Sequence, residues 1–163
     1  MPATILGLPL HPLVVHATVV LVPLTALLVI LTAVSPRVRV WAGPLPLVGA
    51  VISTILAPIS TSTGENLEHS LGESKLIEEH AELGDMLVWF CLGMLVVAGA
   101  TWFLHRRGNV TKGLGTALAA LGVVAGAATM VQVVLIGHSG AKAVWAGEAG
   151  SSSGSSSSAD GGD

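Results

Sequence analysis

The sequence predicts an all-α integral membrane protein, in which four membrane-spanning helices form a bundle and a disordered tail follows. Two observations carry this prediction. Of the 163 residues, 52% are hydrophobic and only 10% are charged, and the mean hydropathy is +0.78, whereas soluble domains carry about 25% charged residues. Four apolar runs also reach the roughly 20 residues that a helix needs to cross a bilayer. A single domain is expected at this length.

The four spans are predicted at residues 12–34, 42–62, 83–104 and 113–136, within a transmembrane domain over residues 1–147. In the first span His11 is expected to be the N-cap and Pro12 the first helical residue, where the missing N–H of proline is no loss. Residues 148–163 are rich in Ser and Gly. Such a composition cannot bury enough apolar surface to fold, so this tail is predicted to be disordered.

Small residues recur every four positions in the second and fourth runs. They are Gly49, Ser53 and Ala57 in the second run and Gly122 and Gly126 in the fourth. A spacing of four places small side chains on one stripe of a helix, which lets neighbouring membrane helices approach closely. We therefore expect these residues to pack helix against helix.

Basic residues cluster in the two short loops that follow the first and third runs. They are Arg37, Arg39, Arg106, Arg107 and Lys112. The opposite side carries only Lys75 and Lys142. The positive-inside rule therefore predicts that the two loops are cytoplasmic and that both termini are extracytoplasmic.

This topology brings five of the six histidines to the outer side of the membrane. The five are His11, His16, His69, His80 and His138. Histidine is the commonest metal ligand, and two histidines can hold a b-type haem. Ionisable residues at the rim of a membrane span are costly and tend to be functional. We expect His16, His80 and His138 to be ligands of a haem or metal ion, with His11 in reserve.

Helical geometry restricts how these ligands combine. His11 and His16 are five residues apart and point about 140° from each other on a regular helix, so they share an ion only if His11 lies outside the helix. Glu65 and His69 are four apart and share a face if their segment is helical. They are expected to support the site.

The residues around the histidines leave the type of cofactor open. Glu79 and Glu82, like Glu65, favour a divalent ion, because carboxylates and imidazoles together bind zinc or iron. Gly84 follows one turn after His80 and favours haem b, since it leaves room for a flat macrocycle. A third alternative is that no cofactor is bound and that the protein is an accessory subunit whose histidines and acids form a docking surface.

Several classes of protein are disfavoured. No basic cluster suits a nucleic acid. The single cysteine, Cys91, lies in an apolar run, which excludes an intrachain disulfide and a covalently attached c-type haem. Transport is less favoured because no charged residue lies in the middle of a span. The first residues lack the positive charge of a cleavable signal peptide. Enzymatic activity and oligomeric state are left open.

Four short motifs resemble a family of bacterial membrane proteins, domain of unknown function 2231. The motifs are Gly-Leu-Pro-Leu-His-Pro-Leu-Val-Val-His at 7–16, Thr63-Gly64-Glu65, His80-Ala81-Glu82-Leu83-Gly84 and Gly137-His138-Ser139-Gly140. The resemblance covers residues 7–147 and implies a four-helix protein of the bacterial plasma membrane. Relatives that stand beside or are fused to Rieske-type iron–sulphur domains imply an electron-transfer setting, with a respiratory or iron–sulphur protein as partner. The family name implies no particular reaction.

Overall fold

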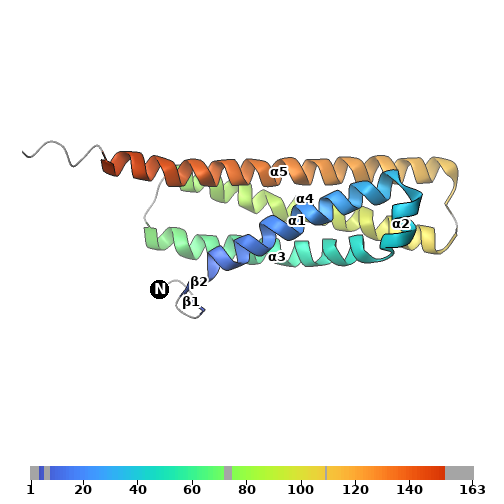
Figure 1. The fold of residues 1–163 in the computed structure, drawn as a ribbon, viewed down its shortest axis with the longest axis horizontal. Helices are drawn as coiled ribbons and strands as arrows, with labels where there is room; N and C mark the ends of the chain where they lie inside the picture. The colour runs from blue at the N-terminus through green and yellow to red at the C-terminus, as the bar shows by residue number, and fades with distance from the viewer. Residues whose placement is uncertain (1–3, 6–7, 72–74, 109, 153–163) are drawn as a thin grey trace, which may run out of the picture.

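Four long helices and one short helix make up most of the chain (Figure 1). The computed structural model describes residues 4–5, 8–71, 75–108 and 110–152. The helices are α1 (Leu10–Val34), α2 (Pro36–Ala42), α3 (Leu45–Leu71), α4 (Lys75–Arg106) and α5 (Lys112–Ser152). Two short strands, β1 (Thr4–Ile5) and β2 (Leu8–Pro9), pair antiparallel before α1.

The long helices form a four-cornered antiparallel bundle. Both α1 and α4 pack along α3 and α5, whereas α1 and α4 touch each other at few points, so they occupy diagonal corners. The starts of α1 and α4 and the ends of α3 and α5 lie at one end of the bundle, here called the histidine end (Figure 1). The opposite end holds α2 and is called the α2 end.

Four helical segments are long and apolar enough to cross a membrane. They are Leu13–Val34, Leu45–Glu65, Lys75–Arg106 and Lys112–Trp145. Large apolar side chains on the outside of the bundle are exposed, among them Val96 at 68% and Val134 at 69%. Such a surface suits lipid rather than water. The predicted fold class, an all-α bundle with four membrane-spanning helices, is therefore confirmed.

The interior of the bundle is built largely from small side chains. Ala26, Ser53 and Ala57 are fully buried. On α5, a Cβ atom added to Gly126 would lie only 2.8 Å from the carbonyl oxygen of Ala26, and one added to Gly122 would lie 3.0 Å from the Cβ of Ala33. The backbones of α1 and α5 thus approach too closely for larger residues, as is usual between membrane helices.

A second close approach joins α3 to α1. A Cβ atom added to Gly49 would lie 2.6 Å from the side-chain oxygen of Thr25. Helix α1 is thus held closely on two sides, by α3 and by α5.

The helices are longer than the predicted spans, and their ends differ from the expected ones. The expectation that His11 caps the first helix is wrong, since α1 begins at Leu10 and His11 lies in its first turn. A short helix, α2, precedes the second span. Ser35 caps this helix, because the Ser35 hydroxyl accepts a hydrogen bond from the backbone N–H of Val38. The chain then leaves α2 at Gly43, which has a φ of 51°.

Helix α5 continues well past the predicted end of the fourth span. It passes through Gly137 and Gly140 without a break and ends at Ser152. Residues 153–163 of the predicted disordered tail lie outside the described residues, so its disorder stays a prediction. The extended part of α5 runs beside the start of α4 at the histidine end, where Ser139 lies against His80.

Candidate functional site

His11 lies at the start of α1 and faces α3. Its Nδ1 atom is 3.2 Å from the hydroxyl oxygen of Thr63. The imidazole ring also fills the space that the missing side chain of Gly64 leaves open, because a Cβ atom there would lie 3.1 Å from the ring carbon Cε1. A hydroxyl and the glycine that follows it therefore fix the position of this ring.

His80 has the same surroundings on the other side of the bundle. It lies near the start of α4, and its Nδ1 atom is 2.9 Å from the hydroxyl oxygen of Ser139 on α5. A Cβ atom at Gly140 would lie 3.0 Å from Cε1 of the His80 ring and 3.3 Å from its Nδ1. Again a hydroxyl and the following glycine hold the ring.

The hydrogen-bond partners assign the tautomer of both rings. The Thr63 hydroxyl donates to a backbone carbonyl of its own helix, at Ile59 or Ser60, with a distance of 2.9 Å to either. The Ser139 hydroxyl likewise donates to the carbonyl of Ile136 at 2.9 Å. Each hydroxyl has one proton and has donated it, so each accepts from the Nδ1–H of its histidine. With Nδ1 as the donor, Nε2 is the ring nitrogen that carries the lone pair in the neutral form of either imidazole.

The bundle thus contains one arrangement twice. Helices α1 and α3 form one hairpin, and α4 and α5 form the other. In each hairpin the first helix supplies a histidine near its start, and the second supplies a hydroxyl and a glycine near its end. Because α1 and α4 occupy diagonal corners, the two histidines belong to opposite corners of the same end of the bundle.

The two histidines also interact electrostatically. His11 precedes the first span, and burial lowers its pKa below the ordinary value. A hydrogen bond with the backbone of Ser60 raises this pKa, and the charge of His80 lowers it. Salt screens the repulsion between exposed charges beyond about 10 Å at 0.1 M ionic strength. A positive charge on His80 therefore disfavours protonation of His11.

Gln132 joins α5 to α4 near His80. Its amide nitrogen donates to the carbonyl oxygen of Leu83 at 2.7 Å, which joins α5 to α4 about one turn below His80. The Gln132 side chain is 5% exposed. A buried hydrogen bond of this kind fixes the register of the two helices, and hence the height of Ser139 relative to His80.

The other residues expected at the site differ from this pair in their exposure or in the helix that they face. The side chains of His16, His138, Glu65, Glu79 and Glu82 are exposed. A Cβ atom at Gly84 would meet the methyl group of Thr61 at 3.5 Å, so this glycine faces α3. His69 belongs to α3, and its side chain lies outside the described part of the chain.

The described residues contain no group of three or more His, Cys, Asp or Glu side chains that could hold a metal ion. That His16, His80 and His138 are ligands of a haem or metal ion stays a prediction. What the described histidine end offers is a pair of imidazoles, His11 and His80, each hydrogen-bonded through Nδ1 to a hydroxyl.

Sequence reasoning missed the partners of these two rings. They are Thr63, Gly64, Ser139 and Gly140. A signal was present, since a hydroxyl residue followed by glycine occurs in the later part of both α3 and α5. It becomes meaningful only when the helices are paired, because His11 and Thr63 are 52 residues apart in the chain.

The comparisons with known proteins agree with this architecture. The model of a family described as "Predicted membrane protein (DUF2231)" matches residues 7–153. The matched range contains all four long helices and both histidine–hydroxyl–glycine arrangements. No curated protein and no solved structure matches the chain.

Proposed function

The chain belongs to the DUF2231 family of membrane proteins, and from this premise we propose that it is a haem-binding electron-transfer subunit in which His11 and His80 would hold the haem iron. The observation that carries the proposal is the pair of imidazoles at one end of the bundle, each with its Nδ1–H donating to a hydroxyl. The family match itself names no reaction.

The number of ligands favours haem over a bare divalent ion. A haem macrocycle supplies four nitrogen ligands, so its iron needs only two from the protein, and two histidines are one such set. A protein zinc site needs three or four protein ligands. Among the described residues no such larger group occurs, whereas a pair of histidines on separate helices does.

The chain's own residues would orient the ligands. A ligating histidine usually donates a hydrogen bond from its other ring N–H to a carboxylate, a carbonyl or another acceptor. This hydrogen bond fixes the tautomer and raises the basicity of the ligating nitrogen. The hydroxyls of Thr63 and Ser139 suit this role, and Gly64 and Gly140 hold the rings in one rotamer. A bound haem would supply one-electron redox chemistry.

The acidic residues suit a different role, recognition of a partner. Glu65, Glu79 and Glu82 are exposed at the histidine end. Clustered charge of one sign steers a partner with the opposite charge and speeds association. We propose that a respiratory or iron–sulphur protein with a basic face docks here and exchanges electrons with the haem.

A second candidate function is supported by the same hydrogen bonds. Each imidazole bridges two helices, His11 from α1 to α3 and His80 from α4 to α5. Such bridges also stabilise a bundle that binds no cofactor. In this alternative the protein is an accessory membrane subunit, and the acidic end is a docking surface only.

Optical spectroscopy separates these functions. Protein purified in mild detergent from a haem-replete host is expected to show a Soret band that shifts on reduction with dithionite, with about one haem per bundle by pyridine haemochrome assay. A colourless protein that contains stoichiometric zinc or iron by elemental analysis would contradict haem binding and indicate a bare metal ion instead. A colourless, metal-free and monodisperse protein would contradict the proposal and favour the accessory role.

A further inference from the structure

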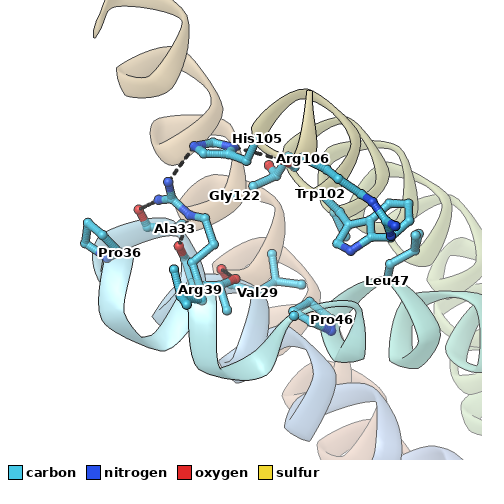
Figure 2. A pocket seen from close by; sticks show the side chains of 15 residues that line it. Val29, Ala33, Pro36, Arg39, Pro46, Leu47, Trp102, His105, Arg106 and Gly122 are labelled. Carbon is cyan, nitrogen blue, oxygen red and sulfur yellow. Dashed lines mark hydrogen bonds between the residues drawn. The ribbon is translucent and has the colours of Figure 1, made fainter. Parts of the chain in front are cut away.

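A pocket lies at the α2 end of the bundle, opposite the histidine end. Its volume is about 370 Å³, which falls within the usual range for small-molecule sites. Every helix contributes to its walls. Figure 2 shows that Arg39 of α2 and His105 of α4 close one side, while Trp102 and Arg106 of α4 stand opposite the start of α3.

Arg39 is held rigidly at this pocket. Its Nε and Nη2 atoms donate to the carbonyl oxygens of Thr32 and Ala33 at 2.8 and 3.0 Å, which caps the end of α1. Its Nη1 atom lies 2.6 Å from Nε2 of His105. The guanidinium has five N–H donors, and these three contacts leave two of them for a ligand.

The charge of Arg39 is not balanced by its partners. Nδ1 of His105 donates to the carbonyl oxygen of Thr101 at 2.8 Å. Nε2 of this ring therefore accepts the hydrogen bond from Arg39, and the ring is neutral. No carboxylate occurs among the described residues that line the pocket. The pocket thus presents a fixed positive charge without a counter-ion.

The surrounding α2 end is also positive. The sequence has no Asp or Glu between residues 1 and 64 or between residues 86 and 147. Arg106 lines the pocket, and its guanidinium carbon lies 5.2 Å from the centre of the Trp102 ring. Stacking on an indole holds an arginine in place while its N–H groups remain available.

The depth of the pocket matches the level of lipid headgroups. The first span ends at Val34 and the second begins at Leu45, so the pocket lies where the helices leave the hydrocarbon core. Its deeper wall is apolar and includes Val29, Leu47 and Ala98. A cationic rim above an apolar wall complements a molecule with an anionic head and a hydrocarbon chain.

We propose that this pocket binds one anionic phospholipid, with its phosphate against Arg39 and Arg106 and the first part of an acyl chain along Val29, Leu47 and Ala98. The lipid supplies the missing counter-charge and fills the space between α2 and α4. The site is separate from the histidine end, so the failure of either proposal leaves the other intact.

Native mass spectrometry of the detergent-purified protein tests this site. Phosphatidylglycerol and phosphatidylcholine with identical acyl chains are titrated separately, and the protein is expected to retain one phosphatidylglycerol with about tenfold preference, because a basic residue near the phosphate favours an anionic headgroup. Arg106→Gln should remove most of this preference. Arg39→Gln should do the same, but it also uncaps α1, so its fold is checked by circular dichroism.

Arg107→Gln is the matched control. It removes the same charge from the same end, yet Arg107 does not line the pocket and lies over the Phe103 ring, 4.4 Å from its centre. This variant should keep the preference for phosphatidylglycerol. Equal losses in the Arg106 and Arg107 variants, or equal retention of both lipids, would overturn the proposal. Displacement of the lipid by an equal concentration of inorganic phosphate would assign the pocket to free phosphate instead.

Discussion

His80→Ala and His11→Ala are each expected to lose nearly all bound haem. Removing a partner that only orients a metal ligand already lowers affinity by about 10–100-fold, and removing an axial ligand should exceed that. The measurement is the haem-to-protein ratio after purification and the affinity on titration with hemin. Size-exclusion chromatography and circular dichroism establish that each variant is folded.

The control for these variants is His138→Ala. His138 immediately precedes Ser139, but its side chain is exposed, so this variant should keep its haem. His16→Ala is expected to behave in the same way, because the His16 side chain is also exposed. Loss of haem from His16→Ala and His138→Ala, with retention in His11→Ala, would contradict the proposed pair and favour the ligands suggested by sequence.

Gly140→Ala is expected to weaken haem binding by about tenfold, without altering any ligand. The added Cβ atom would lie 3.0 Å from Cε1 of His80 and 3.3 Å from its Nδ1. The imidazole must therefore shift, which disturbs its hydrogen bond to Ser139. The measurement is hemin affinity, together with the midpoint potential of the haem that remains.

Gly137→Ala provides the comparison within the same helix. It lies about one turn before Gly140, and a Cβ atom there would meet nothing within 4 Å. Alanine also favours a helix over glycine by about 1 kcal/mol. This variant should therefore bind haem normally and be at least as stable as the native protein. Equal affinities in the two variants would show that the space beside His80 has no role in binding.

The architecture was predictable because it depends on composition and length. Four apolar runs of about 20 residues, separated by polar segments, specify four membrane-spanning helices, since a helix satisfies its backbone hydrogen bonds within its own segment. The ends of the helices were less predictable. Helix α5 runs through Gly137 and Gly140, because packing against α4 outweighs the weak helix preference of glycine.

The pairing at the candidate site was not predictable to the same degree. Sequence placed His11, His80 and His138 at one end of the bundle, but it did not specify which way each ring points. That direction depends on the rotation of each helix about its axis and on the register between neighbours. Gln132 illustrates the difficulty. Its hydrogen bond to the carbonyl of Leu83 joins residues 49 positions apart, and no local sequence pattern predicts it.

Electron paramagnetic resonance of the oxidised protein tests the central claim, that His11 and His80 together ligate one haem iron. Two imidazole ligands make ferric haem low-spin, so the native protein should give a low-spin spectrum, and both His11→Ala and His80→Ala should lose it and turn any remaining haem high-spin. A high-spin native spectrum, or a low-spin spectrum that survives in either variant, would contradict ligation by this pair.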